Sequence, residues 1–174
     1  MLRGMAPRAF LLPYFDAERD EAMLFVAVGV LAVVAAAWLW RGLPRCRGAA
    51  LPLVAIALIQ LVVGGTVWLR TDAQVAALAA RYDSDRSGFQ REEVARMAAV
   101  NRNFRVYKAI EIALLAVAVA LVVASRRRAG ISDDRRDFWR AFGAGLALQA
   151  ALMLTLDLFA EARGGAYAAR IESL

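Results

Sequence analysis

The stretch AIEIALLAVAVALVVAS, residues 109–125, decides the fold of this chain, because it is apolar throughout apart from Glu111 and the final serine. Three further predominantly apolar runs cover residues 22–40, 50–69 and 138–160. An α-helix of about 20 apolar residues matches the ~30 Å hydrocarbon core of a lipid bilayer. The sequence therefore predicts an all-α integral membrane protein with four transmembrane helices.

Outside these runs the chain is too short and too interrupted for a second folded domain, so residues 1–174 are expected to form one membrane domain. The first run follows the acidic stretch 16–21 and is longer than the apolar part of a signal peptide, so we expect it to remain as the first span. Residues 9–15 are apolar and aromatic but too short to cross a bilayer. We expect them to lie along the outer membrane surface.

The composition excludes several classes of function. The chain contains no histidine and a single cysteine, Cys46, which removes a disulfide within the monomer and the usual ligands of zinc, haem and iron–sulfur clusters. We therefore expect no cofactor. The net charge of +6 comes from arginines that flank apolar runs, which fits a protein oriented in a bilayer with anionic lipids. We expect no nucleic-acid partner, because no basic and aromatic platform is present.

Arginine-rich loops give the expected orientation. Residues 41–47 carry three arginines and residues 126–140 carry six, and both stretches lie on one side of a four-span chain. The opposite side has more basic residues in total, but they are spread over a longer length and mixed with acids. The positive-inside rule then predicts an inner (plasma) membrane protein with loops 41–49 and 126–137 in the cytoplasm and both termini outside.

The connection between the second and third spans has the pattern of helices. Thr71 and Ser87 are each followed three residues later by Gln, as in a capping box at a helix N-terminus. Apolar residues recur at helical spacing after each of them. We expect spans two and three to extend outward as a helical hairpin over residues 71–108, rising about 20 Å above the membrane.

The turn of the expected hairpin, DSDRSGFQREEV at residues 83–94, resembles the first half of an EF-hand calcium loop. Its candidate ligands would be Asp83, Asp85, Ser87 and Glu93. The last position of such a loop needs a bidentate Glu, and here it is Val94. A capped helical turn explains the same residues, so we predict no metal site and keep this loop as a weak alternative.

Two acids inside the apolar runs mark the candidate binding site. An acid at the centre of a bilayer costs about 2.5–3.5 kcal/mol, so it usually has a partner or a task. Glu111 and Asp157 are predicted to lie at one depth, each about one helical turn inside the outer end of its span. Their expected neighbours on the same helix faces are Asn103, Tyr107 and Glu161. This set predicts a carboxylate-lined pocket, open to the outside, for a cation, an amine or a lipid headgroup.

The alternative interpretation of these acids is structural. Near the membrane surface they can reach water, or pair with Arg102, Arg105 or Lys108. Gln60 and Gln149, nearly central in the second and fourth spans, pose the same choice. They can hydrogen-bond across two helices, or they can form the floor of a polar cavity below the two acids.

Small residues predict where helices approach one another. The glycines of the spans offer such points at Gly64, Gly65, Gly143 and Gly145. A stripe of alanines runs down the third span at Ala109, Ala113, Ala116 and Ala120. Glu111 points away from this stripe, so we expect the stripe to contact a second protomer in a homo-oligomer.

Three functions of different classes follow from these patterns. The first is binding or conduction of a small solute or cation at the carboxylate site. The second is an interaction or assembly protein that docks a partner through the 71–108 hairpin. The third is an intramembrane enzyme that modifies a lipid with its paired carboxylates as general acid and base. The first is the principal prediction, and a non-enzymatic role is favoured because no catalytic motif is present.

Overall fold

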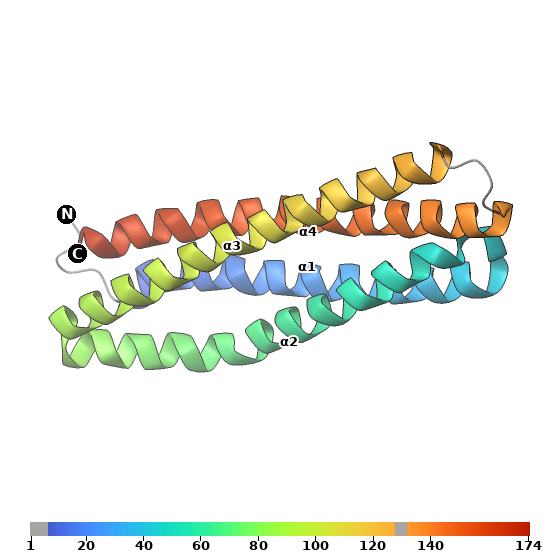
Figure 1. Ribbon diagram of the computed structural model, residues 1–174. Helices are drawn as coiled ribbons and strands as arrows, with labels where there is room; N and C mark the ends of the chain where they lie inside the picture. The colour runs from blue at the N-terminus through green and yellow to red at the C-terminus, as the bar shows by residue number, and fades with distance from the viewer. Residues whose placement is uncertain (1–6, 128–131) are drawn as a thin grey trace.

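The computed structural model describes residues 7–127 and 132–174, and in this part of the chain four long α-helices account for nearly all residues (Figure 1). They are α1 (Pro7–Gly42), α2 (Arg47–Ser84), α3 (Arg86–Arg127) and α4 (Asp133–Glu172), with a short 3-10 helix, η1 (Pro44–Cys46), between α1 and α2. The all-α prediction is confirmed. Each long helix contains a segment that is long and apolar enough to cross a membrane. Part of the expected loop 126–137 lies outside the described residues.

The four helices run lengthwise in one bundle. Helix α1 packs mainly on α2, and α3 mainly on α4, while α4 also contacts α2. Successive helices run in opposite directions, so the start of α1, the turn at Asp85 and the end of α4 lie at one end of the bundle, called here the terminal end (Figure 1). The other end, called the η1 end, carries η1 and the start of α4.

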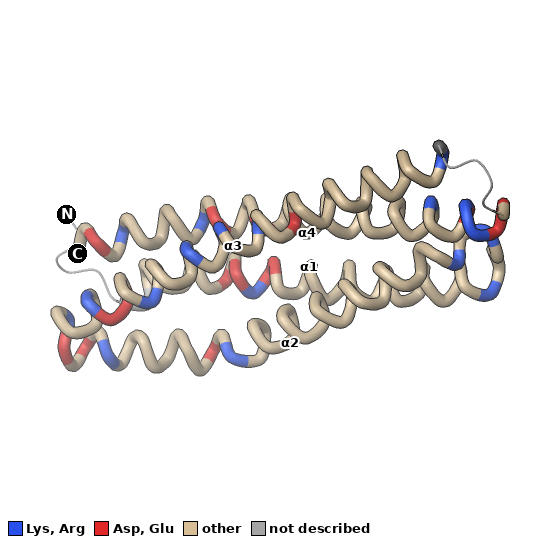
Figure 2. The backbone as a smooth tube through the Cα atoms, viewed as in Figure 1, with Lys and Arg blue, Asp and Glu red and all other residues tan. Residues whose placement is uncertain are grey.

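The positions of charged residues along the backbone leave a wide gap in α1 and α2 (Figure 2). In α1 no Lys, Arg, Asp or Glu occurs between Glu21 and Arg41, and in α2 none occurs between Arg47 and Arg70. We call this part of the bundle the apolar band. At 1.5 Å per residue these gaps are each about 30 Å long.

Beyond the apolar band, the terminal end has an aromatic core supplied by all four helices. Its buried members are Phe10, Leu11, Tyr14, Phe15, Ala79, Tyr82, Phe89, Met97, Tyr167 and Ile171. The rings of Tyr14 and Tyr167 stack with centroids 4.1 Å apart. Residues 9–15, which we expected to lie along a membrane surface, are instead the first turns of α1. Four of their side chains, Phe10, Leu11, Tyr14 and Phe15, are buried because α2, α3 and α4 reach the same end and offer an apolar surface, whereas Leu12 is exposed.

The two predicted capping boxes are wrong. Helix α2 continues through Thr71, whose hydroxyl donates to the Val67 carbonyl one turn earlier, at 2.7 Å. Helix α3 begins at Arg86 and is capped by Asp85, whose carboxylate accepts hydrogen bonds from the Ser87 hydroxyl and the Gly88 N–H. Asp85 is therefore the single residue between α2 and α3.

Glycine allows the close approaches that pair the helices. A Cβ atom on Gly64 would lie 2.7 Å from the Ala22 carbonyl oxygen of α1, and one on Gly143 would lie 2.8 Å from the Ala118 carbonyl oxygen of α3. Gly145 approaches α2 in the same way, whereas Gly65 faces open space. The alanine stripe of α3 is exposed at Ala109, Ala113, Ala116 and Ala120. Contact of α3 with its neighbours within the chain uses the opposite face, which includes the fully buried Ala118.

Candidate functional site

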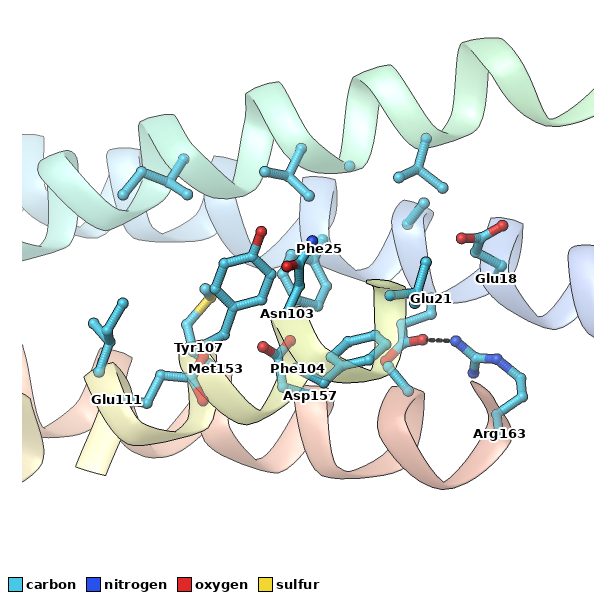
Figure 3. A pocket seen from close by; sticks show the side chains of 18 of the residues that line it. Glu18, Glu21, Phe25, Asn103, Phe104, Tyr107, Glu111, Met153, Asp157 and Arg163 are labelled. Atoms are coloured by element: carbon cyan, nitrogen blue, oxygen red, sulfur yellow. Dashed lines mark hydrogen bonds and ion pairs between the residues drawn. The ribbon is translucent and has the colours of Figure 1, made fainter. Parts of the chain in front are cut away.

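A cavity of about 640 Å³ lies among the four helices, where the terminal end meets the apolar band (Figure 3). Its floor is formed by buried or half-buried side chains of α1 and α4, including Phe25 and Met153. Its rims are formed by α2 and α3. This volume is within the range of about 300–1,000 Å³ that small-molecule sites occupy.

The cavity opens sideways between α2 and α3. The rim residues Ile59 and Val63 of α2 and Tyr107 and Ile110 of α3 line the cavity, yet each is roughly half exposed. Floor residues such as Phe25 are buried. The opening therefore faces the outer surface of the bundle, and it reaches down into the apolar band at Ile59 and Ile110.

The lining changes character along the bundle. Its outer part carries a mixed set of charges from all four helices: Glu18, Glu21, Arg70, Arg96 and Arg163. Glu111 and Asp157 follow deeper in. Below them the lining is apolar, with Ile56, Leu114 and Ala150. The cavity is thus amphipathic, with charged side chains at one end and apolar side chains at the other.

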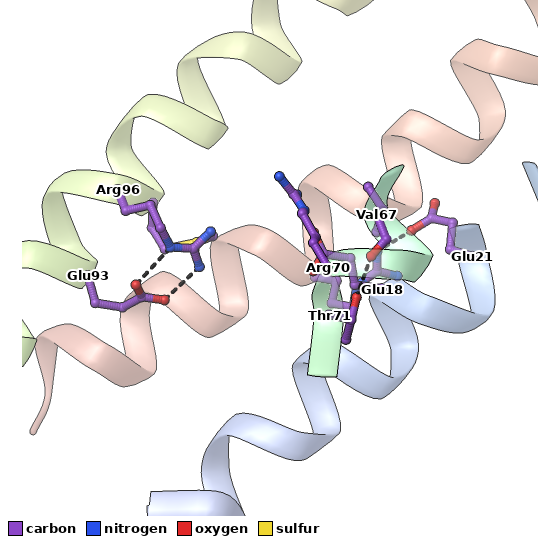
Figure 4. Close-up of polar contacts among 9 residues, drawn as sticks. Glu18, Glu21, Val67, Arg70, Thr71, Glu93 and Arg96 are labelled. Carbon is purple, nitrogen blue, oxygen red and sulfur yellow. Dashed lines mark hydrogen bonds and ion pairs between the residues drawn. The ribbon is translucent and has the colours of Figure 1, made fainter. Parts of the chain in front are cut away.

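The charges of the outer part compensate one another. Arg163 forms an ion pair with Glu21, drawn in Figure 3, and Arg70 lies 3.8 Å from Glu18. Figure 4 shows the other pair, in which the Arg96 guanidinium binds both carboxylate oxygens of Glu93 at 2.6 and 2.7 Å. The arginines that line the cavity are therefore already engaged by carboxylates of the same chain.

Burial changes the protonation of two groups beside these pairs. Burial raises the pKa of Glu18 above its usual range, and the nearby Arg70 guanidinium opposes the shift. Burial, with the negative charge of Glu18, raises the pKa of Tyr14 to about 12. Tyr14 is therefore a neutral phenol at physiological pH, and the ionisation of Glu18 depends on its basic neighbours.

Glu93 lies beside the aromatic core and is bound there on two sides. It is 2% exposed, and besides Arg96 it accepts a hydrogen bond from the Tyr167 hydroxyl at 2.8 Å. Burial and the Glu93 charge raise the pKa of that phenol. The carboxylate is directed into the bundle and away from the turn that holds Asp85.

Among the described residues no group of three or more Asp, Glu, Cys or His side chains could hold a metal ion. The calcium-loop residues Asp83, Asp85, Ser87 and Glu93 do not converge.

Glu111 and Asp157 come from α3 and α4 and lie next to each other in the lining of the cavity, close enough for their carboxyl groups to interact (Figure 3). Glu111 is 5% exposed, and its Oε2 atom has no hydrogen-bond partner. Among the side chains that the structure describes, no basic group forms an ion pair with either acid. Two carboxyl groups can share a hydrogen bond only through a proton, and two carboxylates repel unless a cation lies between them.

The predicted neighbours of this pair separate into two groups. Asn103 and Tyr107 line the cavity, as the helical spacing predicted. Glu161 does not line it, because its carboxylate binds the Lys108 ammonium at 2.5 Å. Lys108, one of the basic residues expected to neutralise Glu111 or Asp157, is thus paired elsewhere.

Gln60 and Gln149 hold α2 to α4 at the level of the inner part of the cavity. The Gln60 side-chain amide donates to the Gln149 carbonyl oxygen at 3.2 Å and contacts the Met153 sulfur at 3.5 Å. The two glutamines are 0% and 1% exposed, and neither lines the cavity. The predicted hydrogen bond across the helices is confirmed, and Gln60 and Gln149 lie apart from the carboxyl pair.

Several lining residues were missed by the sequence analysis. Glu18 and Glu21 belong to the acidic stretch before the first span, and they were not predicted to line a site. Their spacing of three places them on one helix face. Arg163 and Phe25 had no distinguishing pattern, because a single arginine or phenylalanine at a span end is ordinary. Their place in the cavity depends on how the four helices are arranged.

The chain matches no protein-family model, and it has no significant match among curated proteins or among solved structures. The function is therefore argued from the site.

Proposed function

We propose that this chain is a multi-pass protein of the inner (plasma) membrane that binds a small cationic solute at the Glu111–Asp157 pair. The observation that carries the proposal is the position of the pair: two facing carboxyl groups without a basic partner, on the wall of a cavity large enough for a small molecule. Of the functions inferred from the sequence, solute binding is the one for which the described residues supply a site.

The membrane assignment rests on the apolar band. Its length matches a bilayer, and the outer surface of the band is covered by exposed Val, Leu and Ile side chains. Tryptophans, all partly exposed, lie at the ends of the spans, where an aromatic belt is expected: Trp38, Trp40, Trp68 and Trp139. The arginines at the η1 end favour the cytoplasm for that end, and the terminal end, including the 71–108 segment, then lies outside.

The charges of the lining residues favour a cation as the ligand. A carboxylate inside an apolar band loses much of its hydration, and a bound positive charge restores part of the lost stabilisation. An anion would find the lining arginines occupied by Glu21, Glu18 and Glu93. A neutral solute would leave the carboxyl pair uncompensated.

The first experiment is thermal unfolding of the purified protein in detergent against a panel of inorganic and organic cations. A ligand that binds only the folded protein stabilises it by RT ln(1 + [L]/Kd), so a specific cation is expected to raise the Tm of the wild type. Glu111→Gln and Asp157→Asn should remove this rise. Glu161→Gln is the matched control, because that acid lies one turn from Asp157 but is paired with Lys108 and does not line the cavity.

Two results would contradict the proposal. One is that no cation in the panel raises the Tm of the wild type. The other is that the rise survives in both carboxyl variants, which would place the cation elsewhere.

The stripe at Ala109, Ala113, Ala116 and Ala120 is exposed and remains our proposed contact in a homo-oligomer. Crosslinking of cysteine substitutions along the stripe would test this contact.

A further inference from the structure

Resting on the proposed function, we further propose that the ligand is a lipophilic organic cation, an amine or onium group carried on an apolar body, and that it enters sideways between α2 and α3. The residues that line the rest of the cavity, and the position of its opening, favour an organic cation over a metal ion.

The carboxylates of the cavity are not gathered around one point, and among the described residues no three of them are placed to hold a metal ion. Calcium takes six to eight oxygen ligands and magnesium needs an octahedral set. Beside Glu111 and Asp157, the lining carries the polar groups of Asn103 and Tyr107 and the carboxylate of Glu21, which is paired with Arg163. Organic ammonium ions need fewer polar contacts, because part of their surface is hydrocarbon and one counter-charge is sufficient.

Aromatic rings surround the same space. Phe25, Phe104 and Tyr107 line the cavity together with the two acids (Figure 3). The face of such a ring attracts an organic cation within about 6 Å of its centroid, and the attraction is greatest where water is excluded. A carboxylate flanked by aromatic rings therefore suits an ammonium or phosphonium group.

The inner part of the cavity provides room for an apolar body. Ile56, Leu114 and Ala150 line it below the acids, and Ala150 is about 10 Å along α4 from Asp157. An apolar chain or ring system attached to the cation would fill this part and lose its contact with water. A hydrated inorganic ion would leave it empty.

The opening supplies a route from the bilayer. The rim residues Ile59 and Ile110 are half exposed on the surface of the apolar band, one on each side of the opening. A lipophilic cation concentrates near the headgroups of a membrane, at the depth where Glu111 and Asp157 are placed. Entry between α2 and α3 then requires no passage through the paired charges of the outer part.

The test is equilibrium binding of tetraphenylphosphonium to the protein in nanodiscs of neutral phosphatidylcholine, with empty nanodiscs subtracted. Tetraphenylborate, which has nearly the same shape and the opposite charge, is the matched control ligand. We expect saturable binding of the phosphonium, displacement by dodecylammonium and no displacement by Na⁺ or Ca²⁺. Glu111→Gln and Asp157→Asn should each weaken it at least tenfold, and Glu161→Gln should not.

The results separate this inference from the proposed function. If small inorganic cations stabilise the wild type through Glu111 and Asp157 while the phosphonium does not bind, the ligand class is wrong and the cation site stands. If the borate binds as well as the phosphonium, or if both carboxyl variants keep full phosphonium affinity, the inference is overturned. If no cation of either kind binds, the inference and the proposed function fail together.

The route has its own test. The double substitution Ile59→Trp and Ile110→Trp narrows the opening from both rims and is expected to slow phosphonium association at least tenfold. Val62→Trp is the control, because Val62 is exposed on α2 but does not line the cavity. An unchanged association rate in the rim variant would overturn sideways entry.

Discussion

The terminal end and the carboxyl pair are two polar regions of one bundle, and they satisfy their charges in opposite ways. In the terminal end, Glu93 is bound by Arg96 and by the Tyr167 hydroxyl, and it is enclosed by an aromatic core. In the cavity, Glu111 and Asp157 have each other and an open space. A buried acid with fixed partners stabilises the fold, whereas a buried acid without them is available to a ligand.

The largest expected effect comes from the aromatic core. Phe89 is 1% exposed and packs its ring against Phe10 and Tyr82. Phe89→Ala should lower the free energy of unfolding by about 3–5 kcal/mol, because it removes apolar contacts and leaves a cavity. Chemical denaturation in detergent, followed by circular dichroism, measures the loss. Val62→Ala, at an exposed position, should change it by less than about 0.5 kcal/mol, and equal effects would contradict the core assignment.

Replacing one buried Glu by Gln in each region tests whether the two acids differ in their contribution to stability. Glu93→Gln should destabilise the protein by about 2 kcal/mol, because it leaves the Arg96 charge without its partner. Glu111→Gln should cost nothing measurable or raise the stability, because it removes a carboxyl group that faces another one. Both variants are compared with the wild type by the same denaturation measurement. Equal destabilisation would mean that the Glu111–Asp157 pair is structural.

A smaller effect is expected at the hydrogen bond between α2 and α4. Gln149→Leu removes the partner of the Gln60 amide and should cost about 0.6–2 kcal/mol, the range found for polar contacts between helices in membranes. The double variant Gln60→Leu and Gln149→Leu should recover part of this loss, because no buried amide is then left unpaired. Ligand affinity is expected to be unchanged in the double variant, because neither glutamine lines the cavity. A loss of affinity would mean that Gln60 and Gln149 contribute to ligand binding.

The smallest expected effect is the pH dependence that comes from Glu18. Burial raises the pKa of this acid in the folded protein, so the folded state binds its proton more tightly than the unfolded state does. Its contribution is fully favourable below the unfolded pKa of about 4.5, and it is lost as the pH rises through the folded value. Glu18→Gln should flatten this fall in Tm above pH 4.5. Unfolding of both proteins from pH 4 to pH 8 measures the difference, and parallel curves would exclude Glu18 as the source.

Asp85 has the opposite sign, and its effect is measured by extending the same titration below pH 4. Hydrogen bonds from the Gly88 N–H and the Ser87 hydroxyl lower its pKa in the folded protein. Its stabilisation is present above the unfolded pKa of about 3.8 and is lost as the pH falls through the folded value. Asp85→Asn should therefore change the curve at the acid limb, below the range in which Glu18 acts.

The four helices could be predicted from the sequence, but the positions of their ends could not. Apolar runs of about 20 residues specify helices whichever neighbours they meet, so the four long helices were predictable. The capping patterns at Thr71 and Ser87 were misleading, because a local pattern competes with the continuation of a helix that is already formed. Whether residues 9–15 lie on a membrane or in a core depends on three other helices, and no local pattern carries that information.

Part of the candidate site could also be predicted from the sequence, and part could not. Glu111 and Asp157 were identified from the sequence because an acid in an apolar run is unusual in itself. Tyr107 and Asn103 followed from helical spacing. Glu161 was grouped with them for the same reason, but the structure pairs it with Lys108, a residue of another helix. Spacing along one helix describes a face of that helix and does not say which neighbour meets it.

By itself, the sequence determined that this chain forms four long apolar helices, that two acids lie within them, and that it carries no histidine and a single cysteine. These properties follow from composition and from periodicity along one helix, which are local. The tertiary structure alone decided that the two acids face each other, that the arginines of the cavity are already paired, and that the cavity opens between α2 and α3. Such properties depend on which helix faces meet, and that is fixed by packing between residues distant in the chain, such as Gly64 with Ala22 and Gly143 with Ala118.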